Sequence, residues 1–322
     1  MSEATTQREK LLEINHLKKY FHVKNGLLHA VDDVSFYIEK GETLGLVGES
    51  GCGKSTTGRT IIRLLEADGG EVIFHGKNIH DLNATEMKDF RRHVQMVFQD
   101  PYSSLNPRLS IFDLIAEPLT NQHEYQRDKA KLEARVKELM DIVGLSHRLI
   151  NAYPHELDGG RRQRVGIARA LSVNPDFIVL DEPVSALDVC IQAQIINLLI
   201  RLQKDFGLTY LFISHDLSVV KHISNRIGVM YLGKIVELSN YRDIFADPLH
   251  PYTKALLSAI PIPRVGIERQ RIILKGDVPS PVNLPEGCRF AGRCPYAQDR
   301  CFKETPELRE VAPGRFVACH LA

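Results

Sequence analysis

The sequence predicts an α/β protein built on a parallel sheet, with helices between the strands. Short apolar runs recur along the chain, and several of them are followed by a segment with helical periodicity. Such alternation is typical of parallel sheets, whose strands are buried on both faces. The apolar runs lie at residues 43–47, 94–98, 177–180, 210–213 and 227–230.

The composition is that of an ordinary globular protein. The chain has 322 residues, of which 43% are hydrophobic and 25% charged, enough for about two domains. Its 41 Lys and Arg balance 40 Asp and Glu, so no overall charge attracts nucleic acid or anionic lipid. The polar N-terminus and the lack of a long apolar run predict a cytoplasmic chain without a membrane span. At a membrane it would work by docking onto a spanning partner.

The other parts of the chain have their own patterns. Alternating apolar residues at 28–38 and 71–74 predict a small N-terminal antiparallel sheet. Apolar residues at helical spacing between 111 and 145 predict an inserted helical subdomain, at about residues 100–170. From residue 248 the chain is dense in proline, which predicts an irregular extension without a helix or sheet ladder.

A glycine-rich sequence follows the first apolar run. Residues 48–55 match the pattern GxxxxGK[ST], and residues 55–65 continue as a predicted helix. Glycines let the backbone wrap a phosphate with its N–H groups inward, and the helix dipole adds positive charge. We expect Lys54 to reach the β- and γ-phosphates of ATP, Ser55 to bind Mg²⁺ and Thr56 to bond near the α-phosphate. The candidate ATP-binding residues of this loop are Gly48, Ser50, Gly51, Cys52, Gly53, Lys54, Ser55 and Thr56.

Cys52, inside this loop, is interpreted as a small residue that fits there and not as a nucleophile, since no base neighbours it. Alkylation of its thiol is nevertheless expected to block nucleotide binding.

Two adjacent carboxylates end the apolar run at residues 177–180. Phosphate-loop chemistry needs an acidic group at such a strand end to hold the Mg²⁺ shell, and Asp181 suits that role. Glu182, one residue further, is the candidate general base for the water that attacks the γ-phosphate. The pair therefore indicates nucleotide hydrolysis.

With these elements the chain resembles the ATP-binding subunit of an ABC transporter, over about residues 10–260. Further family motifs follow in the family's order: Gln99 at the Q-loop, Asp158, Gly159 and Gly160 at the signature, Asp188 at the D-loop and His215 at the switch position. The resemblance implies a P-loop NTPase fold with a RecA-like parallel core sheet. It also implies that Tyr20, or its neighbour Phe21, stacks on adenine.

The resemblance further implies the roles of individual side chains. It assigns catalysis to Glu182, His215 and Gln99, and Mg²⁺ binding to Ser55 and Gln99. His215 would emerge at the carboxyl edge of the sheet and contact the γ-phosphate. In the family, two cassettes pack head to tail, so each ATP lies between one phosphate loop and the other cassette's signature.

Asp158 departs from the family signature Leu-Ser-Gly-Gly-Gln, whose serine contacts the partner's γ-phosphate. A carboxylate there would repel the phosphate by about 4 kcal/mol at about 4 Å and an effective dielectric of about 20. Asp158 is also a good helix N-cap, and the two roles are compatible. We expect the site that this signature completes to be catalytically poor, which favours a distinct sister ATPase.

Residues 98–107 and 250–257 resemble the dipeptide, oligopeptide and nickel importer branch, and so does the cysteine-rich end of the chain. Cytosolic thiols stay reduced, so clustered cysteines there suggest metal ligation. Four thiolates suit a [4Fe–4S] cluster or Zn²⁺, and the branch resemblance favours the cluster, which would order residues 261–322. The candidate ligands are Cys288, Cys294, Cys301 and Cys319.

The sequence thus predicts an ATPase that energises import of dipeptides, oligopeptides or a related solute such as nickel, peripheral on the cytoplasmic face of the inner membrane. The expected partners are a second, distinct ABC ATPase, two integral-membrane permease subunits and, indirectly, an extracytoplasmic solute-binding protein, but no nucleic acid. A soluble ABC ATPase acting on ribosomes or DNA is the alternative, and the single cassette without a basic stripe weighs against it. A P-loop kinase has no need of both Glu182 and the signature.

Overall fold

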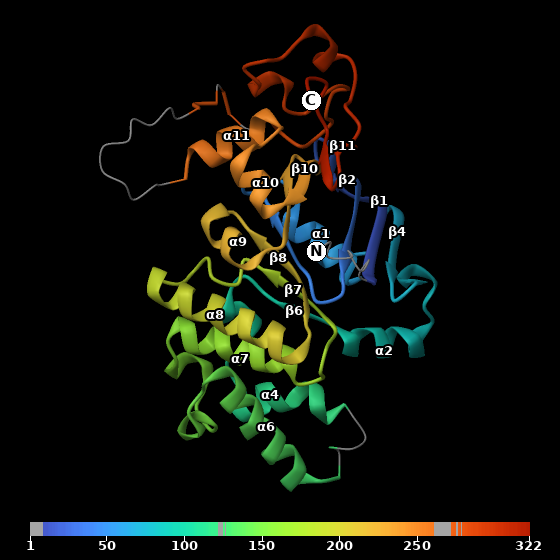
Figure 1. The fold of residues 1–322 in the computed structure, drawn as a ribbon. Helices are drawn as coiled ribbons and strands as arrows, with labels where there is room; N and C mark the ends of the chain where they lie inside the picture. The colour runs from blue at the N-terminus through green and yellow to red at the C-terminus, as the bar shows by residue number, and fades with distance from the viewer. Residues whose placement is uncertain (1–8, 122–124, 126, 261–271, 275, 278) are drawn as a thin grey trace, which may run out of the picture. The chain divides into compact units, whose positions relative to one another are not determined.

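The computed structural model describes residues 9–121, 125, 127–260, 272–274, 276–277 and 279–322. Two compact units make up the chain (Figure 1). The first unit comprises residues 1–81 and 212–322, and the second comprises residues 82–211. Strand β8 (Thr209–Ser214) crosses the boundary between them. The predicted domain limits, 10–260 and 261–322, stay predictions.

An antiparallel sheet forms the N-terminal part of the first unit. Its strand order is β2-β1-β4-β5, so β1 lies between β2 and β4. This confirms the predicted antiparallel sheet. Strand β1 was not predicted, because the second half of its sequence is rich in Lys and His and shows no alternation of apolar and polar residues. The strands are β1 (Lys10–Val23), β2 (Gly26–Glu39), β4 (Gly69–Phe74) and β5 (Lys77–Asn78), and a single 3₁₀ turn follows at Ile79–Asp81.

A second sheet, with the strand order β11-β12-β10-β9-β3-β8-β7-β6, carries the glycine-rich loop. Strand β3 (Thr43–Val47), fully buried, pairs in parallel with β9 (Arg226–Tyr231), and both match the predicted apolar runs. Helix α1 (Lys54–Ile61) follows β3 and is shorter than predicted, since Arg63 has a positive φ of 55°. Helix α9 (Leu217–Ile223) packs on β3.

The end of the chain is more regular than its prolines predict. Strand β10 (Lys234–Asn240) pairs antiparallel with β9 and with β12 (Arg315–Val317), which pairs with β11 (Arg309–Ala312). The prediction of no helix or sheet ladder after residue 248 was therefore wrong. Pro251 begins a helix, where its missing N–H costs nothing, and the last strands are too short to show alternation. The helices are α10 (Tyr241–Ala246) and α11 (Pro251–Ser258), with 3₁₀ turns at Ala291–Arg293 and Asp299–Phe302.

The second unit combines helices with two parallel strands. Strand β6 (Val94–Val97) pairs with β7 (Phe177–Asp181), as the apolar runs predict. Helices α4 (Ile111–Thr120), α6 (Lys129–Val143) and α7 (Gly159–Leu171) pack on one another (Figure 1). Their contacts bury Ile115, Val136 and Val165. The helical pattern predicted between residues 111 and 145 is confirmed. The helices are α2 (Ala84–His93), α3 (Pro101–Ser104), α4 (Ile111–Thr120), α6 (Lys129–Val143), α7 (Gly159–Leu171) and α8 (Val189–Phe206), with 3₁₀ turns at His147–Leu149 and Pro154–Glu156.

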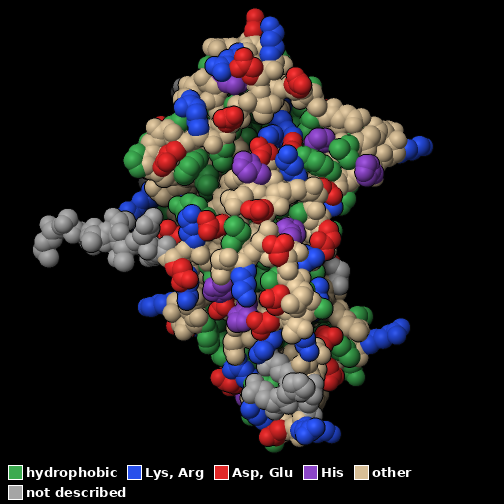
Figure 2. Space-filling model, turned by 90° about the vertical axis from the view of Figure 1, so that its right-hand side faces the viewer, with side chains coloured by type: hydrophobic (Ala, Val, Ile, Leu, Met, Phe, Trp, Pro, Cys, Tyr) green, Lys and Arg blue, Asp and Glu red, His purple; other side chains and the backbone are tan. Residues whose placement is uncertain are grey.

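Acidic and basic side chains are interspersed over the surface that Figure 2 displays, which fits the balanced net charge of +1. Among the described residues, no helix has the length and apolarity needed to cross a membrane.

Candidate nucleotide-binding site

The glycine-rich sequence forms the loop between β3 and α1, and glycine is required at two of its positions. Gly53 has a φ of 105°, and a Cβ there would lie 2.0 Å from the carbonyl oxygen of Ala30. Gly48 has a φ of 156°, and a Cβ there would lie 2.2 Å from the carbonyl oxygen of Met230. Both conditions exclude side chains, so the loop follows a path that only glycine permits.

The Lys54 ammonium lies inside this loop. The residue is only 4% exposed, and its Nζ donates to the carbonyl oxygens of Gly48 at 2.9 Å and of Glu49 at 3.0 Å. The first turn of α1 adds Ser55 and Thr56, both half-buried. A buried cation, a helix N-terminus and a loop with left-handed glycines together form an anion-binding concavity.

Two side chains outside the predicted site contact Glu49, the second residue of the loop. The backbone N–H of Glu49 donates to the Tyr252 hydroxyl at 2.9 Å. The Glu49 carboxylate accepts two hydrogen bonds from Arg293, at 2.8 and 3.2 Å. Tyr252 lies in residues 250–257, whose sequence indicated the importer branch but no contact with the loop. No local sequence pattern marks Arg293.

Cys52 is buried in the loop, with 4% of its surface exposed. Burial raises the pKa of its thiol, and the Lys54 ammonium partly opposes that effect. The Cys52 carbonyl accepts a hydrogen bond from the Gly233 N–H at 2.8 Å. Cys52 is thus a structural residue of the loop, as the sequence indicated.

Alkylation by iodoacetamide should be much slower at Cys52 than at the exposed Cys190. The thiolate is the nucleophile, so a pKa raised above 9.0 leaves little reactive Cys52 at pH 7, and its reaction should accelerate as the pH rises. Site-resolved mass spectrometry at two pH values measures both rates. Equal rates at Cys52 and Cys190 in folded protein would contradict the buried position. If alkylation blocks nucleotide binding, the loss of binding should develop at the slow rate at which Cys52 is alkylated.

The second unit brings Gln99 and Glu182 together. Gln99 Nε2 donates to Glu182 Oε2 at 3.1 Å, although the two residues come from different loops. Asp181 is fully buried at the end of β7, and Glu182 follows with a positive φ of 45°. The Ser185 hydroxyl donates to the Glu182 carbonyl at 3.1 Å and helps to hold this turn. A strained non-glycine backbone at a candidate general base is characteristic of functional sites.

The signature and the D-loop pack against each other within the second unit. A Cβ on Gly160 would lie 2.7 Å from Cγ2 of Ile191, and one on Gly159 would lie 3.0 Å from Cδ2 of Leu187. Asp188 caps α8 by accepting from the Ile191 N–H at 3.0 Å. The glycines of the signature therefore permit a close approach to the D-loop.

Asp158 caps helix α7, as the sequence predicted. Its Oδ1 accepts from the Arg161 backbone N–H at 2.8 Å, and its Oδ2 lies 3.5 Å from Arg161 Nε. Both side chains are more than half exposed, so this ion pair contributes little stability. The carboxylate therefore lies at the surface beside the signature glycines.

The two neighbouring aromatic residues near the N-terminus, Tyr20 and Phe21, make different contacts. The Tyr20 ring lies 4.5 Å from the His29 ring, and its hydroxyl donates to Asp32 at 2.6 Å. Phe21 is 36% exposed, with the Lys19 ammonium 5.4 Å from its ring. Tyr20 is therefore an anchoring residue in this structure, and its predicted contact with adenine stays a prediction. His215, directly after β8, is exposed.

The four C-terminal cysteines are grouped in space. The pKa of Cys288 is raised to about 11, mainly by burial and to a smaller extent by the neighbouring thiols of Cys301, Cys319 and Cys294. The Cys288 N–H donates to the Cys301 carbonyl at 2.7 Å. Yet the described residues contain no group of three or more His, Cys, Asp or Glu side chains that could hold a metal ion. The [4Fe–4S] cluster is thus not confirmed.

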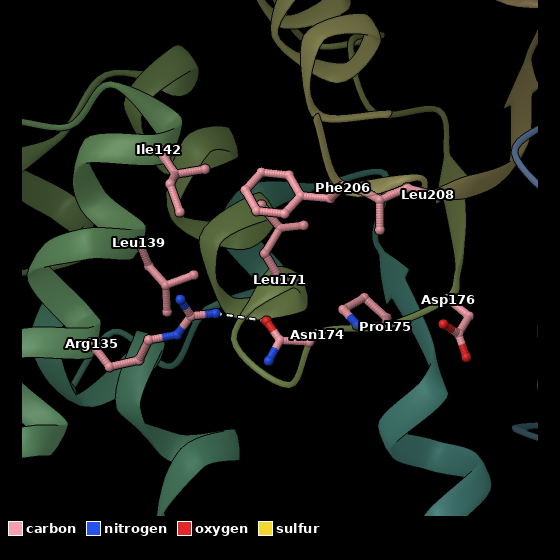
Figure 3. A pocket seen from close by; sticks show the side chains of 9 residues that line it. All are labelled: Arg135, Leu139, Ile142, Leu171, Asn174, Pro175, Asp176, Phe206 and Leu208. Atoms are coloured by element: carbon pink, nitrogen blue, oxygen red, sulfur yellow. Dashed lines mark hydrogen bonds between the residues drawn. The ribbon is translucent and has the colours of Figure 1, made fainter. Parts of the chain in front are cut away.

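Two cavities lie away from these motifs. One of about 130 Å³ in the second unit is lined by Leu139, Leu171 and Phe206, with Arg135 donating to Asn174 at 2.7 Å (Figure 3). The other, of about 720 Å³ in the first unit, lies among β1, β2, β10 and residues 305–308. No predicted site residue lines either cavity.

Comparisons with known proteins define the class. Residues 31–185 match the ABC transporter family, and residues 236–301 match the C-terminal region of oligopeptide/dipeptide transporters. The solved dimeric ATP-binding cassette MJ0796, bound to ADP and Pi, is 30% identical, with a TM-score of 0.66, over 72% of this chain and 99% of that one. CbiO1 of Clostridium perfringens is 27% identical, also with a TM-score of 0.66, over 74% of this chain and 92% of that one. The fold is therefore that of an ABC ATPase cassette.

Full-length relatives specify the branch. OppF of Bacillus subtilis is 56% identical over 312 residues, covering 97% of this chain and 96% of the relative, and AppF of the same organism is 53% identical over 98% of both chains. OppF of Haemophilus influenzae is 50% identical over 98% of both chains. All three are described as oligopeptide transport ATP-binding proteins. The chain belongs to this family of ABC transporter ATP-binding proteins.

Proposed function

We propose that this chain is the ATP-hydrolysing subunit of an ABC importer that takes up oligopeptides. The observation that carries the proposal is the occurrence, on one chain, of an ABC cassette and the C-terminal region of oligopeptide/dipeptide transporters. Relatives that are 50–56% identical over almost their whole length are oligopeptide transport ATP-binding proteins. The names of these relatives favour oligopeptides over nickel. A role on ribosomes or DNA has no comparable support.

ATP binding is assigned to the phosphate loop. The backbone N–H groups of residues 48–53 and the Lys54 ammonium would bind the phosphates, because the loop path and the buried cation suit an anion. Ser55 and Gln99 would hold Mg²⁺, which neutralises phosphate charge when bound. Gln99 turns its amide nitrogen toward Glu182, so its amide oxygen is the donor that suits a hard cation. Asp181 would hold the outer shell.

Hydrolysis is assigned to the residues after β7. Glu182 would orient the attacking water and take its proton on the carboxylate. Gln99 donates a hydrogen bond to that carboxylate and keeps it in one orientation. His215 would donate to the γ-phosphate as it separates. These roles are supported by the order of the motifs along the chain and by the class to which the chain belongs.

The partners follow from the class of transporter. The chain would pair with a second ABC ATPase and dock on two permease subunits at the cytoplasmic face of the inner membrane, with a solute-binding protein acting from outside. Affinity purification from cells tests this: an integral-membrane partner should copurify. Recovery of ribosomes or DNA in its place would contradict the proposal.

Replacing Asp158 by serine should raise ATP turnover of the assembled complex. Serine caps a helix about as well as aspartate, so α7 should stay intact while the charge is removed. Asp158→Asn is the matched variant that also removes the charge and keeps the cap. Steady-state phosphate release from the purified complex measures the effect. Unchanged or lower turnover in both variants would reject the idea of a catalytically poor site and the heterodimer that it favours.

The four C-terminal cysteines are proposed to hold a [4Fe–4S] cluster, with Zn²⁺ as the alternative. The proposal rests on the all-thiol composition of the four positions and on the electrostatic influence of the other thiols on Cys288 and Cys294. When bound, the group would crosslink four points of a segment that has few apolar side chains. Iron, sulfide and zinc analysis of anaerobically purified protein separates the two: stoichiometric iron supports the cluster, and zinc alone supports the alternative. If the protein contained neither iron nor zinc, this part of the proposal would be refuted.

A further inference from the structure

Residues 288–294, here called the cysteine segment, begin and end with a cysteine and lie in the same compact unit as the phosphate loop. The segment is anchored by Phe290, which is 1% exposed. The Phe290 ring centroid lies 5.3 Å from that of Tyr231 and 5.4 Å from that of Tyr252. Tyr252 is the residue whose hydroxyl accepts the Glu49 N–H of the phosphate loop. The anchor of the segment therefore packs directly on a support of the loop.

Arg293 connects the cysteine segment to the phosphate loop directly. Its two terminal nitrogens donate to the two carboxylate oxygens of Glu49, and the side chains are only 10% and 27% exposed. These hydrogen bonds raise the pKa of Arg293, which stays charged. The Glu49 carbonyl in turn accepts from Lys54 Nζ and from the Cys52 N–H. A paired, bidentate arginine thus fixes a residue on which the loop lysine depends.

Arg289 makes a second connection through a turn. It forms an ion pair with Asp32 and donates to the Leu232 carbonyl. Leu232 and Gly233 both have positive φ, of 42° and 81°, so this turn needs external support. The Gly233 N–H donates to the Cys52 carbonyl of the phosphate loop at 2.8 Å. Arg293 therefore contacts the loop directly at Glu49, whereas Arg289 acts on it only through the turn that contacts Cys52.

We propose that Arg293 and Arg289 are positioning residues for ATP, through which the cysteine segment sets the geometry of the phosphate loop and hence its affinity for nucleotide. The inference rests on the proposed function, because it concerns the same nucleotide site. Loss of Arg293 has two effects that act in the same direction. The loop loses a constraint at Glu49, and a partly buried carboxylate left without its cation repels the phosphates.

Titration of the purified full chain with a fluorescent ATP analogue and Mg²⁺ tests the proposal. Arg293→Met should raise the Kd about 10-fold. The matched control is Arg300→Met, since Arg300 pairs with Glu304 in the same region but is 61% exposed; its Kd should stay within about twofold. Arg289→Met should weaken binding less than Arg293→Met, because it acts through the turn. In the assembled complex, kcat at saturating ATP should be unchanged by Arg293→Met while KM rises.

A double-mutant cycle with Glu49→Gln shows whether Arg293 acts through Glu49. In the Glu49→Gln background the stranded charge is absent, so adding Arg293→Met should change the Kd less than about twofold. An equal effect in both backgrounds, or an Arg293→Met Kd equal to that of Arg300→Met, would overturn the proposal. If Arg293→Met fails to fold, Arg293→Lys decides, because lysine keeps the charge but cannot form the bidentate pair with Glu49: an unchanged Kd overturns the proposal and a raised one supports it. Lys54→Ala in the same titration tests the proposed function separately, since retained binding there refutes nucleotide binding by the loop itself.

Discussion

Replacing Glu182 by glutamine is expected to lower the rate of ATP hydrolysis at least about 100-fold, while ATP still binds. Glutamine has the shape of glutamate and can still accept the hydrogen bond from Gln99, but it takes up no proton from water. The backbone at Glu182, with a φ of 45°, should be unaffected by an isosteric change. Steady-state phosphate release by the assembled complex, together with a nucleotide-binding titration, measures both quantities.

The matched control for that experiment is Glu133→Gln. Glu133 lies on α6, pairs with Lys137 and is 54% exposed, so removing its charge should leave hydrolysis unchanged. If Glu182→Gln kept more than about a tenth of the wild-type rate, Glu182 would not be the general base. A loss of ATP binding in Glu182→Gln would show that the carboxylate acts earlier, in binding.

Replacing Gly53 by alanine should distort the phosphate loop and lower the melting temperature by at least about 5 °C. The added Cβ would lie 2.0 Å from the backbone oxygen of Ala30, and a φ of 105° is strained for any residue with a side chain. Neither conflict can be relieved by rotating a side chain, so the backbone must move. Differential scanning calorimetry and an ATP titration should show a lower melting temperature and a loss of nucleotide affinity together.

Gly51→Ala provides the comparison for Gly53→Ala. Gly51 also has a positive φ, of 77°, but a Cβ there would meet nothing within 4 Å. The cost should therefore be limited to backbone strain of about 1 kcal/mol, which corresponds to a smaller fall in melting temperature. Equal shifts in the two variants would mean that the contact with Ala30 does not determine the loop path.

Sequence predicts well those parts of the fold that are determined by residues close to one another in the chain. The fully buried strand β3 is a continuous apolar run, and the loop after it has a motif whose glycines are needed at fixed positions. The N-cap at Asp158 likewise depends on residues within one turn. Strands β11 and β12 escape prediction because they are too short to show alternation and join the sheet only through the pairing of β12 with β10, which is distant in the chain.

The contacts of the candidate site that the sequence did not predict also join residues that are distant in the chain. Arg293 and Glu49 are 244 positions apart in the chain, and neither has a local pattern that marks it as a partner. Tyr20 shows the opposite problem. Its position matches a family aromatic, but the contacts of its ring with His29 and of its hydroxyl with Asp32 depend on the folded chain. Packing between distant segments therefore decides roles that motif order leaves open.

The most direct test of the account replaces Lys54 by alanine in the complex purified with its natural permease partners and reconstituted in vesicles. The buried ammonium of Lys54 lies within the loop assigned to the phosphates, so its removal should abolish ATP binding at this loop. ATP hydrolysis and oligopeptide uptake, measured on the same vesicles, should both fall to background. Full ATP-driven uptake by the Lys54→Ala complex would contradict the claim that this chain powers import through its phosphate loop.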